Sequence, residues 1–221
     1  NNAINVMTYV GNRENEQYLS LPSSPPVNAN GRASEISRDF WGADVRWDNK
    51  GNVLNRPYNF SLGLTYGKSD DTRMDINADN GVKRVLGTPF SLNREEGNIS
   101  TNFDQYAQGK LSILDNLDLH AGARHTKVKL EVKDALITGT NPDNSGNVEY
   151  QKTTPVMGAV WKVTPTFNLY ANYGKGFETP TFIEAAYNST ASSATPNLNL
   201  KPSESRNYEL GAKAFLGNNT Q

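Results

Sequence analysis

Two segments near the C-terminal end alternate apolar residues with polar residues or glycine, and this alternation constrains the fold more than any other feature. The apolar positions of the first segment are Phe167, Leu169, Ala171 and Tyr173. Those of the second segment are Tyr208, Leu210, Ala212 and Ala214. A period of two indicates β-strands with one apolar and one polar face. The roughly thirty residues between them far exceed a hairpin turn, so we expect a long strand, a long connection and a long returning strand.

The same alternation occurs in six earlier segments. They cover residues 4–10, 41–47, 58–67, 103–113, 117–124 and 150–163, and the first of them is expected to continue through the polar residues up to 18. The intervening sequence is long and polar at 19–34, 69–100 and about 138–147, and short and turn-like at about 48–57, 114–116 and 164–165. Long and short connections therefore alternate. This layout predicts an all-β antiparallel meander of about eight long strands that pair only with their sequence neighbours, with almost no helix and with all long loops at one end.

A transmembrane β-barrel wall fits this pattern better than a soluble sheet does. Strands of about 12 residues rise ~40 Å, which a tilt of ~45° reduces to the ~28 Å of a bilayer core. Aromatic residues lie near the strand ends, as an interfacial girdle requires: Trp41, Trp47, Tyr58, Tyr66, Trp161 and Tyr173. We expect the apolar side chains to face lipid and the charged ones to line a wet lumen. The charged residues are Asp44, Arg46, Asp118, Arg124, Glu209 and Lys213.

Composition excludes several other classes of protein. Apolar residues make up 36% of the chain, and no run of eighteen of them could cross a bilayer as a helix. The net charge of −1 gives no basic field for nucleic acid. The chain has no cysteine, and its two histidines, His120 and His125, are predicted on opposite faces of one strand, a poor geometry for a shared metal. Because no nucleophile–base pair can be placed either, we expect no enzyme activity, no cofactor and no metal site.

Three short motifs resemble the late barrel strands of TonB-dependent outer-membrane receptors, and among these the siderophore-type receptors look closest. The motifs are Tyr-Gly-Lys-Gly-Phe-Glu-Thr-Pro at 173–180, Asn-Leu-Lys-Pro at 199–202 and Asn-Tyr-Glu-Leu-Gly at 207–211. The resemblance implies a 22-stranded barrel with an N-terminal plug, in the outer membrane of a Gram-negative bacterium. It also implies uptake of a ferric siderophore or similar chelate with energy from TonB, and contact with outer-membrane lipid.

Residues 1–221 are expected to form part of the barrel domain, because nothing in the sequence matches the plug or the TonB-contacting box of such receptors. Both ends look cut, so the first and last strands should not pair with each other. Two alternatives remain open at this stage. One is a complete eight-stranded barrel that acts as a structural anchor or adhesin, and the other is a soluble carbohydrate-binding β-sandwich.

Candidate ligand contacts are arginines and aromatic residues near the long connections. They are Arg13, Tyr18, Arg38, Arg73, Arg94, Phe177 and Tyr187. Arginine binds anionic catecholate or carboxylate groups through charge-assisted hydrogen bonds, and aromatic rings offer stacking faces. Contact with a ligand in the lumen further requires that these side chains point inward.

Overall fold

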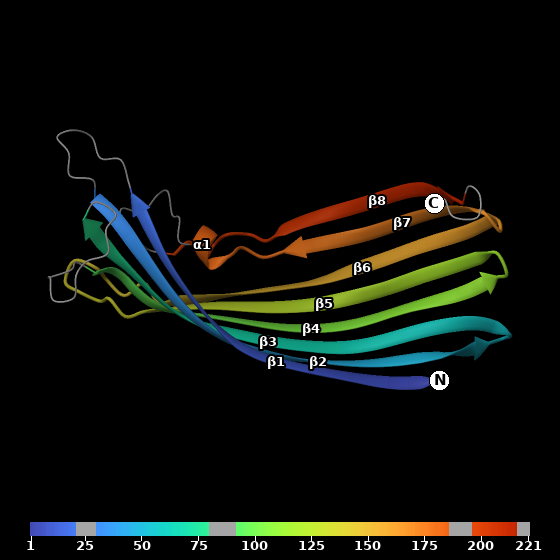
Figure 1. The fold of residues 1–221 in the computed structure, drawn as a ribbon, viewed down its shortest axis with the longest axis horizontal. Helices are drawn as coiled ribbons and strands as arrows, with labels where there is room; N and C mark the ends of the chain where they lie inside the picture. The colour runs from blue at the N-terminus through green and yellow to red at the C-terminus, as the bar shows by residue number, and fades with distance from the viewer. Residues whose placement is uncertain (21–29, 80–91, 186–195, 216–221) are drawn as a thin grey trace.

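The computed structural model describes residues 1–20, 30–79, 92–185 and 196–215. The described part contains one antiparallel sheet of eight strands in chain order (Figure 1). The strands are β1 (Asn2–Ser20), β2 (Asn30–Val53), β3 (Arg56–Asp79), β4 (Leu92–Leu114), β5 (Leu117–Asp134), β6 (Gly146–Thr164), β7 (Phe167–Glu178) and β8 (Ser203–Ala214). The only helix among the described residues is the four-residue α1 (Phe182–Ala185). The predicted antiparallel meander is therefore confirmed.

All three tight turns lie at the same end of the sheet (Figure 1). Leu54 and Asn55 join β2 to β3, and both have positive φ, which a two-residue type I′ hairpin turn requires. The β4–β5 and β6–β7 turns are equally short, at Asp115–Asn116 and Pro165–Thr166. The long connections leave from the opposite end, which we call the long-connection end.

The pairing register gives the sheet two chemically different faces, because directly paired residues project from the same side. Trp47 pairs with Leu62, whereas the next residue inward, Arg46, pairs with Gly63. The apolar face carries Ile4, Val6, Val10, Trp41, Val45, Trp47, Tyr58, Phe60, Leu62, Leu64, Leu117, Leu119, Trp161, Leu169, Tyr208 and Leu210. The polar face carries Asp44, Arg46, Asp118, Arg124, Glu209 and Lys213. The predicted division of these residues between two faces is confirmed.

The strands are longer than the sequence pattern predicted. Residues 69–100 were expected to form a loop, but β3 continues to Asp79 and β4 begins at Leu92. Similarly, β2 begins at Asn30, within the stretch expected to be loop. These extensions are rich in polar and charged residues, and only the short run Met74, Ile76 and Ala78 at the end of β3 alternates with polar residues. Cross-strand ion pairs and hydrogen bonds take the place of apolar contacts there.

The sheet is a single layer, so very few side chains are buried (Figure 1). The buried apolar residues among those described are Ala33, Leu130, Val132, Tyr150 and Ala185. The sheet order ends at β1 and β8, and the described residues show no pairing between these two strands. A closed eight-stranded barrel is therefore not observed. No helix in the described part of the chain is long and apolar enough to cross a membrane.

Candidate functional site

Arginines gather on the polar face at the long-connection end of β1–β4. Arg13 on β1 pairs with Arg38 on β2, and Arg38 pairs with Asp71 on β3. Arg73 and Arg94 follow on the same face, where Arg73 pairs with Glu96. Four of the seven predicted ligand contacts are thus on one surface, which we call the arginine surface and define as Arg13, Arg38, Arg73 and Arg94.

Carboxylates on the same strand or on a neighbouring strand bind three of these arginines. Arg38 donates two hydrogen bonds to the buried Asp71, from Nε to Oδ1 at 2.7 Å and from Nη2 to Oδ2 at 2.5 Å. Arg73 donates from Nε and Nη2 to Asp75 at 3.2 and 2.9 Å. Bidentate pairs of this kind fix the guanidinium planes, and the Arg38–Asp71 pair also joins β2 to β3.

The Arg73–Asp75 pair belongs to a compact network of alternating charge. Arg94 lies 3.7 Å from Asp75 and 3.6 Å from Glu96, and Arg73 lies 3.8 Å from Glu96. All four side chains are at most 19% exposed. Arg73 and Arg94 are therefore well placed for holding β3 against β4 and less accessible to a ligand.

Arg13 differs from the other three arginines. It is exposed, and no carboxylate of the described residues lies within ion-pair distance of it. The neighbouring Arg38 is half-exposed, at 41%, although it is bound to Asp71. Arg13 and Arg38 are adjacent, and Asp71, the carboxylate that binds Arg38, lies on the side of Arg38 away from Arg13. The positive charge of Arg13 is therefore left in excess at this end of the polar face, which suits an anionic ligand.

A second structural feature lies on β5 and β6, where the connection between β7 and β8 folds back onto the sheet. The buried Tyr150 donates its hydroxyl hydrogen bond to the carbonyl oxygen of Leu200 at 2.9 Å. Leu198 lies against Gly146, where an added Cβ would come within 2.5 Å of the leucine side chain. Asn197 donates its backbone N–H to the Ala185 carbonyl at 2.6 Å. These contacts cover an apolar patch that includes Leu130 on β5.

The short helix α1 that precedes this folded-back segment has a reciprocal cap. The Thr181 backbone N–H and hydroxyl donate to Glu184 Oε2 at 2.8 and 2.9 Å, and the Glu184 N–H donates to Thr181 Oγ1 at 3.3 Å. This arrangement is a capping box. The hydrogen bonds from Thr181, the backbone one first, hold the pKa of Glu184 below its ordinary value.

Replacing Tyr150 with phenylalanine should loosen residues 196–202 without unfolding the sheet. The change removes one buried hydrogen bond to the Leu200 carbonyl, which is worth about 1 kcal/mol. Amide hydrogen exchange in that segment should accelerate about fivefold, while exchange in β4 and β5 stays unchanged. Tyr170→Phe is the matched control, because that hydroxyl binds an exposed carboxylate, Glu209. Equal acceleration in both variants would contradict the anchoring role of Tyr150.

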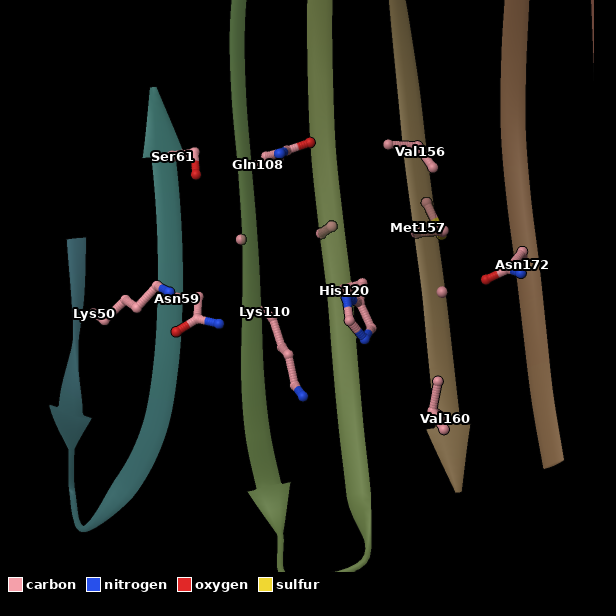
Figure 2. A pocket seen from close by; sticks show the side chains of 13 residues that line it. Lys50, Asn59, Ser61, Gln108, Lys110, His120, Val156, Met157, Val160 and Asn172 are labelled. Carbon is pink, nitrogen blue, oxygen red and sulfur yellow. The ribbon is translucent and has the colours of Figure 1, made fainter. Parts of the chain in front are cut away.

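A hollow of about 530 Å³ with a mixed polar and apolar lining lies on the polar face nearer the tight turns. Figure 2 shows side chains from several strands around it, including Lys110, His120 and Asn172. Beside it the buried Asp118 accepts a hydrogen bond from Ser112 at 2.6 Å and lies 2.9 Å from Lys110 and 3.0 Å from Lys162. The negative charge of Asp118 is thus balanced by two lysines, and its contacts join β4, β5 and β6 on this face.

The three remaining predicted contacts are placed less favourably or not at all. Tyr18 donates a hydrogen bond to Glu16 and pairs with Ala33, on the face that continues the apolar one. Phe177 pairs with Glu204 and, by alternation from Tyr173, also follows the apolar face. Tyr187 lies outside the described residues. The carboxylates Asp71, Asp75 and Glu96, together with Tyr150, were not among the predicted residues.

Metal-binding geometry is absent from the described residues, since no group of three or more His, Asp or Glu side chains could hold an ion there. The two histidines lie on opposite faces of β5 as predicted: His120 pairs with Lys110 on the polar face, and His125 pairs with Gln105 on the apolar face.

Comparison with known proteins agrees with the fold. The ferripyoverdine receptor of Pseudomonas aeruginosa is 29% identical over 146 residues, which is 65% of this chain and 15% of the receptor. The crystal structure of the ferric citrate transporter FecA superimposes with a TM-score of 0.77 at 17% identity, covering 96% of this chain and 30% of FecA. The siderophore receptor PiuA from Acinetobacter baumannii gives 0.75 at 14% identity, covering 98% and 36%.

The chain therefore spans only about a third of these solved structures and less of the curated relative. Its sequence matches the family model for the TonB-dependent receptor-like β-barrel over residues 3–221. The relatives named here are receptors or transporters rather than enzymes. This chain belongs to the β-barrel family of TonB-dependent receptors.

Proposed function

We propose that this chain is a wall segment of an outer-membrane active-transport receptor that binds and imports a ferric siderophore or a similar small iron chelate. The apolar face contacts outer-membrane lipid, and the polar face lines the transport path. Residues 1–221 belong to the barrel domain, and the plug and the contact with TonB come from other parts of the receptor. The protein works by binding and transport, not by catalysis, and nucleic acid is not a partner.

The arginine surface is the observation that carries this proposal. Ferric chelates of citrate, catecholate and carboxylate-bearing siderophores present negative oxygen atoms, which guanidinium groups bind with charge-assisted hydrogen bonds. Arg13 is exposed and has no carboxylate partner among the described residues, and it lies beside the half-exposed Arg38. The relatives support the same substrate class, since their names refer to ferric pyoverdine, ferric citrate and siderophores.

The test is binding of ferric chelates to the complete receptor that contains this chain. Ferric citrate, a ferric tris-catecholate and ferric pyoverdine would be titrated by calorimetry. Arg13→Ala should weaken binding of the preferred chelate at least tenfold, because a hydrogen bond from a charged group contributes about 1.5–3 kcal/mol and tenfold corresponds to about 1.4 kcal/mol. Arg13→Lys should recover only part of the affinity, because it keeps the charge and loses the planar fork.

Arg206→Ala is the control. Arg206 is also exposed, but it lies on β8 on the side of the sheet that continues the apolar face, away from the arginine surface. The substitution should leave the affinity unchanged. Arg38→Ala is less informative, since it would leave the buried Asp71 unpaired and disturb the sheet. Unaltered affinity of Arg13→Ala for every chelate that the receptor binds would refute the assignment of Arg13.

A further inference from the structure

Small residues on β4 and β5 leave a groove in the apolar face. Gly109 pairs with Ala121, and Ala107 pairs with Ala123 on the next rung. The bulky side chains of β3, such as Leu62 and Leu64, line one side of the groove. Two shallow hollows of about 620 and 580 Å³ result, and both are lined by Ala107 and Ala123. Together they form one continuous groove along the strands, which we call the small-residue groove.

The groove ends in polar groups toward the long-connection end. The rung after Ala107–Ala123 is Gln105–His125, and His125 Nδ1 lies 2.9 Å from Thr153 Oγ1. Apolar lining therefore gives way within one rung to side chains that donate and accept hydrogen bonds.

Two lysines continue the same ladder immediately beyond these polar groups. Phe103 pairs with Lys127, and Thr101 pairs with Lys129. Their ammonium groups are paired, Lys127 with Glu149 at 3.0 Å and Lys129 with Glu131 at 2.9 Å. The two lysine side chains are nevertheless 48% and 43% exposed, and exposed ion pairs of this kind are weak and easily exchanged for another anion.

The lysines lie at the level where lipid headgroups are expected. The rings of Trp41 and Tyr66 are in tilted contact with 5.1 Å between their centroids, and Tyr66 pairs with Phe103 on β4. Aromatic side chains at one level of a membrane protein mark the interface between the apolar core and the headgroups. On the rungs of Lys127 and Lys129, β1 and β2 carry only uncharged residues on this face, where Thr8 pairs with Ala43 and Val10 pairs with Trp41. The basic residues on these two rungs above the small-residue groove are therefore Lys68, Lys127 and Lys129, each paired with one acidic residue.

We propose that the small-residue groove binds one phosphorylated lipid of the surrounding leaflet. An acyl chain fills the hollow over Ala107 and Ala123, and the headgroup phosphate lies against Lys127 and Lys129. Basic residues that flank an apolar surface bind anionic headgroups in this way, and the groove supplies a matching site for the chain. The inference rests on the membrane placement given under the proposed function, although not on the identity of the chelate.

The test is retention of lipid by the complete receptor, extracted from outer membranes in mild detergent and examined by native mass spectrometry. One phosphorylated lipid should remain bound to the wild-type protein. Two variants should each reduce its occupancy at least fivefold: Lys127→Gln with Lys129→Gln, which removes the charges, and Ala123→Leu, which fills the groove. Addition of inorganic phosphate should not displace the lipid, whereas a site for phosphate alone would release it.

Matched controls lie on β7 and β8. Lys175→Gln with Arg206→Gln removes two charges from one rung of the apolar face, and Ala212→Leu enlarges an exposed alanine on β8. Both should retain the lipid. Full occupancy in both groove variants, or absence of lipid from the wild type, would overturn the proposal. Chelate affinity measured on the same samples should be unchanged in the groove variants. Recovery of the receptor in the outer-membrane fraction tests its proposed placement in that membrane. These two readouts distinguish a failure of the lipid proposal from a failure of the proposed function.

Discussion

Replacing Leu62 with arginine should destabilise the folded receptor by about 2–4 kcal/mol in a bilayer. Leu62 lies in the middle of the apolar stripe of β3 and pairs with Trp47 on one side and Ala107 on the other. It is 39% exposed on a face with no second layer, and in the proposed membrane placement this side chain contacts lipid. An arginine there has no carboxylate on the same face nearby and must distort the bilayer to reach water.

The measurement is equilibrium unfolding in urea of the complete receptor refolded into lipid vesicles, followed by tryptophan fluorescence. Gln108→Arg is the control, because Gln108 is exposed on the polar face of the adjacent strand, one residue away from the partner of Leu62. Gln108→Arg should lower the free energy of unfolding by less than about 0.5 kcal/mol, as expected for a surface substitution that disturbs no packing. Equal destabilisation by the two variants would mean that the apolar face is not the lipid-contacting face.

The existence, order and facing of the strands could be predicted from the sequence for a simple physical reason. A strand places successive side chains on opposite faces, so an alternation such as Tyr58, Phe60, Leu62 and Leu64 already fixes which residues lie together. Strand length could not be predicted in this way. In β3 residues 69–73 are all polar and the alternation resumes only at Met74 and Ile76, so the partners on β2 and β4 are what show that the strand is continuous.

The arginine surface was only partly predictable. Residue type and proximity to long connections indicated Arg13, Arg38, Arg73 and Arg94, but the sequence does not give the register that brings Arg38 to Asp71, 33 residues away. Register decides which arginine is already bound by a carboxylate. Tyr18 was predicted by the same reasoning, and alternation alone would have placed it opposite to Arg13.

The apolar patch under the folded-back segment did carry a signal in the sequence. On β5 the apolar residues occupy odd positions up to Ala123 and even positions from Val128 to Val132, while charged residues such as Lys129 take over the odd positions. The strand keeps its period, so the apolar side chains change face. Val132 and Leu130 are 4% and 5% exposed on the polar face. This change of phase marks the point where β5 leaves the apolar band and where an inner segment can pack.

A large loss of stability is also expected when a side chain is added at a glycine whose cross-strand partner is aromatic, and Gly42 is the clearest such position. Gly42 pairs with Tyr9 on β1 and with Gly67 on β3, on the polar face. The Tyr9 ring lies across the glycine, in the space that a Cβ would occupy, and a Cβ would also come within 2.6 Å of the backbone oxygen of Tyr66. The ring can rotate away, but the oxygen is held within the sheet. Gly42→Ala should therefore lower the free energy of unfolding by about 1–3 kcal/mol, as other overpacked positions do.

Gly174→Ala is the matched control for this substitution. Gly174 also lies within a strand on the polar face, but an added Cβ there would meet only Val156 Cγ2, at 3.9 Å, an ordinary contact. The control should be neutral or more stable by up to about 1 kcal/mol, since alanine lowers the entropy of the unfolded chain.

Combining Gly42→Ala with Tyr9→Ala separates the two contacts in a double-mutant cycle. Partial recovery is expected, because the Tyr66 oxygen remains in place. Full recovery would assign the whole effect to the ring, and a Gly42→Ala protein as stable as the Gly174→Ala protein would show that the pair does not constrain the sheet.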